Sequence, residues 1–472
     1  MLDVSLRPAP RVRNRALRVP PWRAGPKPRR RTELGLLVLS SLCTASLYVI
    51  ASLGDRSRIP PHIGPFLAVL LGLSLVVHLA NRWLVPEANP VLLPLAALLN
   101  GMGYVVIARW SPSYAKAQAG WAALGVLLYI VTLLVVRRSR DLDRYRYLLL
   151  LAAILLILAP LVPGVGLNIY GARLWVRVLG VQFQPVEVAK ILLCVFFASY
   201  FAERKELLSI PTARLGNRLV LDPRPLVPIV LAWAFAMLVI GAENDIGFAM
   251  LIFTLFIAML WITGGRMAYL VLGLVIFAVG AVVSAHLFGQ VHQRVTIWLD
   301  PWKTPSGSGL QLVNGWYALG TGGVGGTGLG QGVVSGHVPL LTSDMILAGI
   351  GEEMGLMGTS AVAIAFLLLV GAGFHIAQRA RSDFSRLVAA GLTIILGFQA
   401  FFIMAGVLRL LPLTGVTLPF VAYGGSSLIT NYVLVALLMR ISDEGATTPG
   451  RRGAGGSGLL RPGDRPWRPA DD

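Results

Sequence analysis

The stretch IGFAMLIFTLFIAMLWIT at residues 246–263 decides the fold, because it contains no charged side chain. A helix needs about 20 predominantly apolar residues to cross the hydrocarbon core of a bilayer. Comparable apolar runs recur along the 472 residues, and the mean hydropathy of the chain is +0.72. The sequence therefore predicts an all-α polytopic membrane protein and argues against a soluble domain.

About twelve transmembrane helices are expected from these runs. The first run is interpreted as a retained helix, because it has spanning length and lacks a clear signal-peptide cleavage site. The connection at 288–344, before the tenth helix, is too long for a passive loop, so function is expected there. The expected spans are residues 34–53, 64–81, 90–108, 119–136, 147–163, 185–202, 225–241, 246–263, 268–287, 345–371, 387–408 and 418–439.

The net charge of +19 would suit a nucleic-acid partner if it lay on one folded surface. Instead, most of the 41 Lys and Arg residues fall in loops that share one side when the N-terminus is cytoplasmic. This charge is expected to orient the helices and to contact anionic lipid, and no nucleic acid is expected. Both termini are then cytoplasmic, and the connection at 288–344 is extracytoplasmic.

The chain divides into four parts by composition. The ends, 1–31 and 442–472, are rich in Pro, Gly and Arg, which predicts disordered cytoplasmic tails. Between them we expect N-terminal transmembrane helices at 32–163 and a membrane core at 164–441, which includes the large outer loop.

Ionisable side chains enter the membrane at QPVEVAK, residues 184–190. Pro185 suits the first position of a helix, and Glu187 and Lys190 are then one turn apart. An ionisable pair in a membrane helix is costly and is by default functional, although a structural bridge between helices stays open. Arg173, in the outer loop before this helix, suits a pyrophosphate or lipid head group.

Further charges lie outside the spans. Asp245 follows Glu243 in a short outer turn, and it is either the N-cap of the next helix or part of a site. Arg294 and Lys303 are cations of the large outer loop, near tryptophans that are typical of membrane anchors.

The glycines at 319–332 resemble a nucleotide loop only superficially, because no Gly-Lys-Ser/Thr follows them. Two interpretations stay open for them. They provide tightly turning backbone, or they expose N–H groups to a phosphate or sugar ligand.

The segment LTSDMILAGIGEEMG, residues 341–355, places Asp344 at the outer mouth of an apolar helix and two more acids inside it. On a continuous helix, Glu352 would lie about 80° around and about 12 Å along from Asp344. Glu353 would point the opposite way, toward another helix or a basic partner.

The chain resembles the SEDS family of bacterial wall growth, which includes FtsW, RodA and SpoVE. Members usually have ten spans, and the two additional N-terminal helices expected here resemble actinobacterial members. Four blocks carry the likeness: GARLW to FQPVEVAK at 171–190, GAENDIGFAML at 241–251, the region from GSGLQL to EEMGLMG at 307–358, and LPLTGVTLPFVAYGGSSLI at 411–429.

The resemblance implies a peptidoglycan glycosyltransferase that polymerises lipid II at the outer face of the bacterial cytoplasmic membrane, in elongation, division or sporulation. It implies a class B penicillin-binding protein as the transpeptidase partner and Asp344 as the catalytic residue. The expected substrate-binding residues are Arg173, Gln184, Glu187, Lys190, Asp245, Arg294, Lys303, Gln311, Glu352 and Ser426.

The chemistry of such a transfer needs a base beside the attacking sugar hydroxyl and positive charge beside the leaving pyrophosphate. Asp344 is the best base in the sequence, and the arginines and lysines named above are the available cations. No cofactor is assigned. A divalent cation, Mg²⁺ or Mn²⁺, stays open, although no cluster of metal ligands supports it beyond His337 and Asp344.

Two rival functions use the same residues. A lipid II flippase could line its path with Glu187, Lys190 and Glu352. A non-catalytic scaffold would bind a transpeptidase and would not depend on Asp344.

Overall fold

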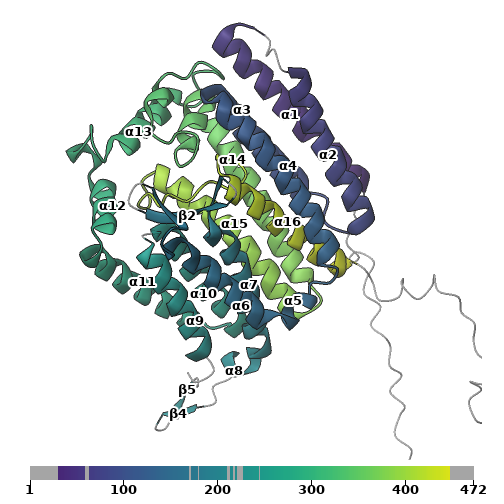
Figure 1. Cartoon of the computed structure of the whole chain (residues 1–472), viewed down its shortest axis with the longest axis vertical. Helices are drawn as coiled ribbons and strands as arrows, with labels where there is room; N and C mark the ends of the chain where they lie inside the picture. The colour runs from purple at the N-terminus through teal and green to yellow at the C-terminus, as the bar shows by residue number, and fades with distance from the viewer. Residues whose placement is uncertain are drawn as a thin grey trace, which may run out of the picture.

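The computed structural model describes residues 30–58, 63–169, 172–178, 180–209, 213–215, 218–220, 227–243 and 245–446. The predicted tails at 1–31 and 442–472 lie largely outside these residues, so their disorder stays a prediction. Long helices pack side by side into one bundle (Figure 1). The expectation of an all-α polytopic membrane protein is confirmed.

Ten helices in the described part of the chain are long and apolar enough to cross a membrane. They are α1 (Arg30–Arg56), α2 (Ile63–Leu84), α3 (Leu92–Trp110), α4 (Pro112–Val135), α7 (Pro185–Glu203), α10 (Ile246–Gly264), α11 (Met267–Leu287), α14 (Ile346–Arg379), α15 (Asp383–Val407) and α16 (Gly425–Ala446).

The two other predicted spans coincide with shorter helices. These are α6 (Arg146–Leu158), which continues into the 3-10 turn η2 (Ala159–Leu161), and α9 (Val227–Ala242). Every predicted span therefore holds a helix, while the number that cross the membrane stays a prediction.

Small elements connect the long helices. The three antiparallel strands β1 (Gly166–Ile169), β2 (Ala172–Val178) and β3 (Val181–Phe183) lead into α7. The connection at 288–344 contains two helices that the sequence analysis did not expect, α12 and α13. The remaining elements are α5 (Asp141–Arg144), α8 (Lys205–Ser209), β4 (Ala213–Leu215), β5 (Arg218–Val220), α12 (Gly289–Leu299), η4 (Pro301–Lys303), α13 (Leu310–Gly322) and η5 (Val334–His337).

The centre of the bundle is built around α7 and α15. The most apolar 18-residue stretch of each helix is 83% buried in α7 and 78% buried in α15. Aromatic rings fill it, and Phe197 and Phe201 of α7 pack against Phe256 of α10. Helices α2 and α11 lie at the periphery on different sides of the bundle (Figure 1). Only 17% and 11% of their most apolar 18-residue stretches are buried. Their apolar outer faces suit contact with lipid.

Helix α14 is interrupted at Gly355, where φ is 62° and ψ is −159°. A backbone of this kind is almost restricted to glycine. The glycine-rich loop packs against the break: Thr327 N donates to Glu352 O at 2.8 Å, and Leu356 N donates to Gly323 O at 2.9 Å. A Cβ added at Gly326 would lie 2.2 Å from Glu353 O. This supports the interpretation of the glycines as closely packed, tightly turning backbone.

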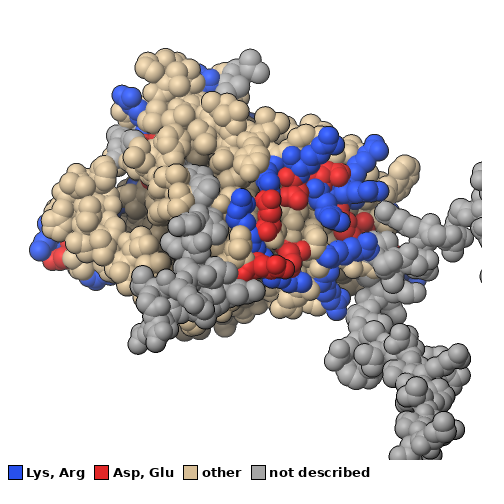
Figure 2. All heavy atoms as spheres, turned by 90° about the horizontal axis from the view of Figure 1, so that it is seen from below, with Lys and Arg blue, Asp and Glu red and all other residues tan. Residues whose placement is uncertain are grey.

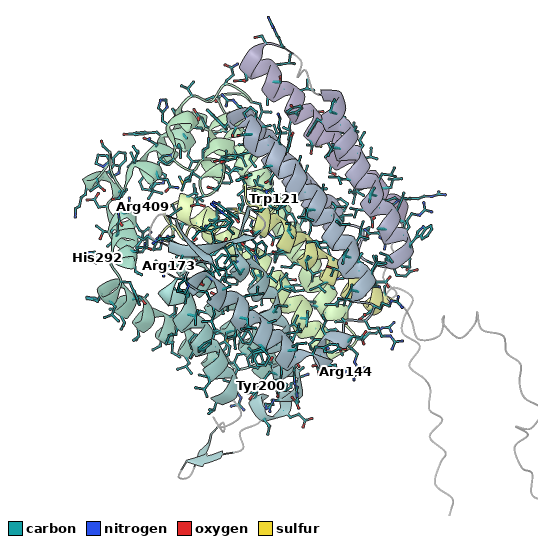
Figure 3. All side chains as sticks on the ribbon, viewed as in Figure 1. Trp121, Arg144, Arg173, Tyr200, His292 and Arg409 are labelled. Atoms are coloured by element: carbon teal, nitrogen blue, oxygen red, sulfur yellow. The ribbon has the colours of Figure 1, made fainter. Side chains whose placement is uncertain are left out.

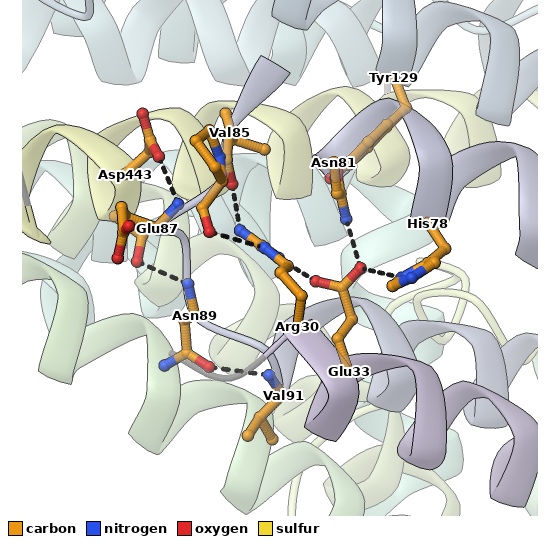
Figure 4. Close-up of polar contacts among 12 residues, drawn as sticks. Arg30, Glu33, His78, Asn81, Val85, Glu87, Asn89, Val91, Tyr129 and Asp443 are labelled. Carbon is orange, nitrogen blue, oxygen red and sulfur yellow. Dashed lines mark hydrogen bonds and ion pairs between the residues drawn. The ribbon is translucent and has the colours of Figure 1, made fainter. Parts of the chain in front are cut away.

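A polar cluster fastens α1 and α2 to the rest of the bundle (Figure 4). Glu33 of α1 is fully buried, forms an ion pair with Arg30, and accepts a hydrogen bond from Asn81 at 3.2 Å. His78 Nδ1 lies 3.1 Å from the same carboxylate, and the Tyr129 hydroxyl of α4 donates to Asn81 at 2.7 Å. Buried charge is tolerated here because each group has polar partners.

The end of α16 joins the same region. Arg440 donates to Leu84 O at 2.9 Å and to Val136 O at 2.8 Å, while Asp443 accepts from Glu87 N at 2.8 Å. Figure 2 shows Lys and Arg interleaved with Asp and Glu on the face seen from below. A charged face at one end of an apolar bundle is typical of a membrane protein whose charged loops lie in water.

Candidate functional site

A cavity of about 860 Å³ lies beside Asp344. Its walls come from β2 and β3, the N-cap residue of α7, the first turns of α10 and α16, helices α4, α12 and α13, and the loops before α14 and α16. Segments far apart in the sequence therefore meet here. Its lining comprises Tyr114, Trp121, Leu174, Trp175, Gln182, Gln184, Phe248, Gln290, Gln293, Arg294, Ile297, Trp298, Ser308, Gln311, Leu312, Leu340, Thr342, Ser343, Asp344, Leu413, Gly415, Val416, Thr417, Tyr423, Gly424, Gly425, Ser426 and Ser427.

Asp344 lies in the turn before α14, with its side chain partly buried. Among the described residues, no hydrogen bond or ion pair to its carboxylate is found within the usual distances. Burial raises the pKa of Asp344 to about 6, and the nearby Arg294 guanidinium opposes part of this rise. A carboxyl group with such a pKa is ionised at neutral pH and is suited to accept a proton.

Arg294 is held in place from α12. Its Nη1 donates to Thr414 O at 2.7 Å and to Leu413 O at 3.3 Å. A Cβ added at Gly415 would lie 3.6 Å from Arg294 Nη2 and 3.9 Å from Asp344 Oδ2, so the cation and the acid flank the same glycine. Among the lining residues that the structure describes, Arg294 is the sole Lys or Arg.

Polar side chains complete the wall around this pair. The backbone N–H of Gln184 donates to Ser426 Oγ at 2.9 Å, which joins the start of α7 to the start of α16. Gln311 Nε2 and Thr417 Oγ1 are buried and have no hydrogen-bond partner among the described residues. Unsatisfied donors and acceptors in a cavity wall are suited to bind a hydroxyl-rich ligand.

Aromatic residues form another part of the wall, and the sequence analysis did not single them out. Tyr114 and Tyr423 stack with ring centroids 4.5 Å apart. The indole of Trp121 lies so close to Gly425 that an added Cβ would be 2.4 Å from its Cε2. Figure 3 shows Trp121 near the centre of the view and Arg173 to its left. No sequence signal distinguishes these aromatics from ordinary membrane anchors.

Glu187 and Lys190 pair as expected but do not line the cavity. Both side chains are buried, and Lys190 Nζ also donates to Gln399 Oε1 at 2.9 Å. Gln399 in turn donates to Thr417 O at 3.1 Å. The structural interpretation is thus favoured for this pair. It contacts the cavity wall only indirectly, because Gln399 links Lys190 to the lining residue Thr417.

Asp245 is the N-cap of α10, since its carboxylate accepts from Phe248 N at 3.1 Å, and that interpretation is confirmed. Asp245 lies outside the lining of the cavity. Burial raises its pKa to about 7, and burial beside Asp245 raises the pKa of Glu243 to about 9. Glu243 is therefore protonated at neutral pH.

Glu352 and Glu353 also lie outside the cavity lining. Because α14 begins at Ile346, Asp344 is not on the same helix, and the angle expected between Asp344 and Glu352 does not apply. Glu352 accepts hydrogen bonds from Val333 N and Val334 N, both at 2.8 Å, and from Ser335 N at 2.7 Å.

The basic partner expected for Glu353 is Arg109 of α3, with which it forms a buried ion pair. Glu353 also accepts from Gly330 N at 3.0 Å, and Arg109 donates to Gly332 O at 2.7 Å. Arg109 was missed because it lies at the end of the predicted span 90–108, where arginine side chains commonly extend to the membrane interface and do not signal a buried partner.

Arg173 and Lys303 stay outside the lining as well. Arg173 is exposed on β2, whose next two residues, Leu174 and Trp175, do line the cavity. The side chain of Lys303 is 71% exposed and lies 3.9 Å from Asp300. Of the predicted site residues, the structure therefore brings together Asp344, Gln184, Arg294, Gln311 and Ser426.

Comparison with known proteins shows the same family over most of the chain. Residues 94–447 match the FtsW/RodA/SpoVE family, described as "Cell cycle protein". The peptidoglycan glycosyltransferase RodA of Mycobacterium bovis is 36% identical over 433 residues, which cover 89% of this chain and 92% of that protein. A probable peptidoglycan glycosyltransferase FtsW of a Geobacter species is 36% identical over 297 residues, covering 62% and 77%.

Solved structures agree in fold. A chain solved in work on the coordination of polymerization and crosslinking by a peptidoglycan synthase complex matches with a TM-score of 0.61 and 27% identity, covering 75% of this chain and 97% of that one. RodA of Thermus thermophilus matches with a TM-score of 0.56 and 24% identity, covering 78% and 100%. The chain belongs to the FtsW/RodA/SpoVE family of integral membrane proteins.

Proposed function

We propose that this protein is a peptidoglycan glycosyltransferase that polymerises lipid II at the outer face of the bacterial cytoplasmic membrane. One observation carries the proposal: the Asp344 carboxylate lines a large polar and aromatic cavity beside Arg294, without a protein partner among the described contacts. The relatives named peptidoglycan glycosyltransferases support the same activity.

The reaction joins the 4-hydroxyl of one disaccharide to the anomeric carbon of another. Asp344 accepts the hydroxyl proton as the new C–O bond forms, and the bond from the anomeric carbon to the lipid pyrophosphate breaks with its electron pair on the leaving oxygen. Arg294 is the cation available in the cavity to stabilise the negative charge that develops on the pyrophosphate. Gln311 and Gln184 are placed to bind sugar hydroxyls or amides.

Replacing Asp344 by Asn tests this assignment. Loss of a general base typically lowers a rate by about 100-fold to 10,000-fold. We expect Asp344→Asn to lower lipid II polymerisation by that factor in purified, detergent-solubilised protein, measured as glycan strands on a gel.

Asp300→Asn is the matched control, because Asp300 is an acid of the same outer segment that does not line the cavity. It should polymerise lipid II at the rate of the unchanged protein. Full activity in Asp344→Asn would overturn the assignment.

We also propose that any divalent cation, Mg²⁺ or Mn²⁺, reaches the site with the substrate. The described residues contain no group of three His, Cys, Asp or Glu side chains that could hold a metal ion. Mg²⁺ is commonly bound through one or two carboxylates plus substrate phosphates, and Asp344 is the sole acid among the described lining residues. Activity should fall with EDTA and return with Mg²⁺, whereas equal rates with and without EDTA would remove the cation from the proposal.

The partner and the orientation belong to the same proposal. We infer that a class B penicillin-binding protein cross-links the strands, and that both termini are cytoplasmic, because most basic loops then lie inside. Co-purification from membranes followed by identification of the associated transpeptidase tests the partner. Labelling of single cysteines placed near each terminus, with a reagent that cannot cross the membrane, tests the orientation.

The transport hypothesis has less support in the geometry. Its residues, Glu187, Lys190 and Glu352, are engaged in internal contacts and do not line the cavity. Lipid II placed only in the inner leaflet of vesicles separates the two functions, since a flippase moves it without forming polymer.

A further inference from the structure

A second cavity, of about 460 Å³, lies between α1, α2, α3 and α4. None of the residues that line it lines the cavity of Asp344. The two cavities are therefore separate, and the family match begins at residue 94, after α1 and α2. This second cavity is a feature of the N-terminal helices.

The position of the cavity follows from how these helices are fastened. The cluster around Glu33 holds the beginning of α1 against the ends of α2 and α4 (Figure 4). The cavity lies at the opposite end, where its lining comes from the last turns of α1 and α3 and the first turns of α2 and α4. Helices α1, α2 and α4 are thus joined at one end, and together with α3 they enclose a space at the other.

The interior of this cavity is apolar and aromatic. Phe66 of α2 packs between Tyr48 of α1 and Tyr104 of α3, with centroid distances of 4.4 and 5.0 Å. Leu70 and Leu73 of α2 extend the apolar wall. Helix α2 is the outermost helix on this side, and only 17% of its most apolar 18-residue stretch is buried. The cavity therefore lies next to the lipid phase. Its volume is within the roughly 300 to 1,000 Å³ of typical ligand pockets.

The mouth of the cavity carries a lysine that has no ion-pair partner among the described residues. Arg109 is neutralised by the ion pair with Glu353 and by Asp55, which lies 3.8 Å from its Nε. Lys116 of α4 also lines the cavity and is exposed, and no carboxylate of a described residue lies within 4.0 Å of its ammonium group. Ala119 is one turn farther along the same face of α4 and lines the interior.

We propose that this cavity binds an anionic phospholipid, with one acyl chain between α2 and α4 and the phosphate at Lys116. An apolar interior beside the bilayer suits the chain, and an unpaired lysine at the mouth suits a phosphate. The proposal concerns a lipid that is not consumed, and it does not depend on the glycosyltransferase activity or on Asp344.

Lipid retention by the full-length protein tests the proposal. The protein is purified in detergent, mixed with phosphatidylglycerol or phosphatidylcholine, and the bound lipid is counted by native mass spectrometry. We expect one phosphatidylglycerol per chain to be retained in preference to phosphatidylcholine. Lys116→Gln should weaken phosphatidylglycerol retention about fivefold, which corresponds to about 1 kcal/mol for a basic residue at an anionic lipid surface.

Three further variants distinguish binding in the cavity from general lipid adhesion. Ala119→Trp fills the interior and should abolish the retained phosphatidylglycerol, whereas Ala117→Trp, on the same helix but outside the lining, should leave it unchanged. Lys303→Gln, an exposed outer lysine far from this lining, should also leave it unchanged. Equal retention in all four variants would overturn the proposal, and so would retention of a polyprenyl phosphate in place of phosphatidylglycerol.

Discussion

Asp344 and the pair Glu352 and Glu353 lie within ten residues of one another, yet their surroundings are opposite. Asp344 faces a cavity and has no protein partner among the described contacts. In contrast, Glu352 accepts hydrogen bonds from three backbone N–H groups, and Glu353 forms an ion pair with Arg109. A carboxylate that the fold has satisfied stabilises structure, while one that the fold leaves unsatisfied is available to a ligand. The following substitutions test this difference.

The largest effect is expected where the buried ion pair is broken. Removing one partner of a buried pair costs about 3–5 kcal/mol, because the other charge stays buried. Glu353→Gln and Arg109→Gln should each lower the thermal unfolding midpoint of the purified protein substantially. The double variant Arg109→Leu with Glu353→Leu should recover much of the loss. Single variants that unfold at the original midpoint would show that the pair has no structural role.

Glu352→Gln should have the next largest effect, and it should be local. Charged hydrogen bonds contribute about 1.5–3 kcal/mol, and the amide keeps only part of the acceptor capacity of the carboxylate. Hydrogen exchange should therefore accelerate at the amides of Val333, Val334 and Ser335. Ser343→Ala, a cavity-lining change outside this network, serves as the control and should leave those amides protected. Unchanged protection in Glu352→Gln would contradict the assigned role.

The pH dependence of polymerisation should report Asp344. Activity needs the carboxylate, so the rate should rise as the pH passes through about 6. Arg294 stabilises the charged form and so lowers the pKa of Asp344; Arg294→Gln should move this acidic limb toward higher pH, by about one unit. A limb that stays in place, with only the maximal rate reduced, would assign Arg294 to the substrate alone.

The smallest effect is expected for the stability of Asp344→Asn, and its sign is opposite to that of the Glu353 variants. Burial raises the pKa of Asp344 in the folded state above the ordinary aspartate value, so the ionised group destabilises the fold. This destabilisation is absent below about pH 4 and fully present above about pH 6. Asp344→Asn should therefore unfold at an equal or slightly higher temperature at pH 7.5, measured as a thermal midpoint. A midpoint lowered by several degrees would mean that Asp344 is structural.

The sequence predicts the helices well because each span is a long apolar run whose length is set by the bilayer. It predicts Asp344, Gln184, Gln311 and Ser426 as site residues because they belong to family blocks that the fold brings together. Arg294 was named for its charge, as a cation of the long connection before α14. The sequence could not distinguish these residues from Glu187 or Lys190, because the direction in which a side chain points within a bundle depends on contacts far apart in sequence. The tyrosines and tryptophans of the cavity were missed for the same reason.

The break at Gly355 shows a second limit of sequence reasoning. The predicted geometry requires one continuous helix from Asp344 to Glu352, whereas α14 begins only at Ile346. Beyond both residues, α14 changes direction at Gly355. The change of direction at Gly355 is caused by the close approach of the glycine loop, since a Cβ at Gly355 would lie 2.4 Å from Gly326 N. A contact between two separated glycine positions leaves no periodic signal in either segment.

The hydrogen bonds of Arg440 have a consequence for biosynthesis. Arg440 is near the end of the last helix, yet it donates hydrogen bonds to the carbonyl groups of Leu84, the last residue of α2, and Val136, the residue after α4. A membrane protein is synthesised from its N-terminus, so these carbonyl groups lack the Arg440 donor until almost the whole chain has left the ribosome. Helices α1 to α4 therefore enter the bilayer early but reach their final packing only when α16 arrives.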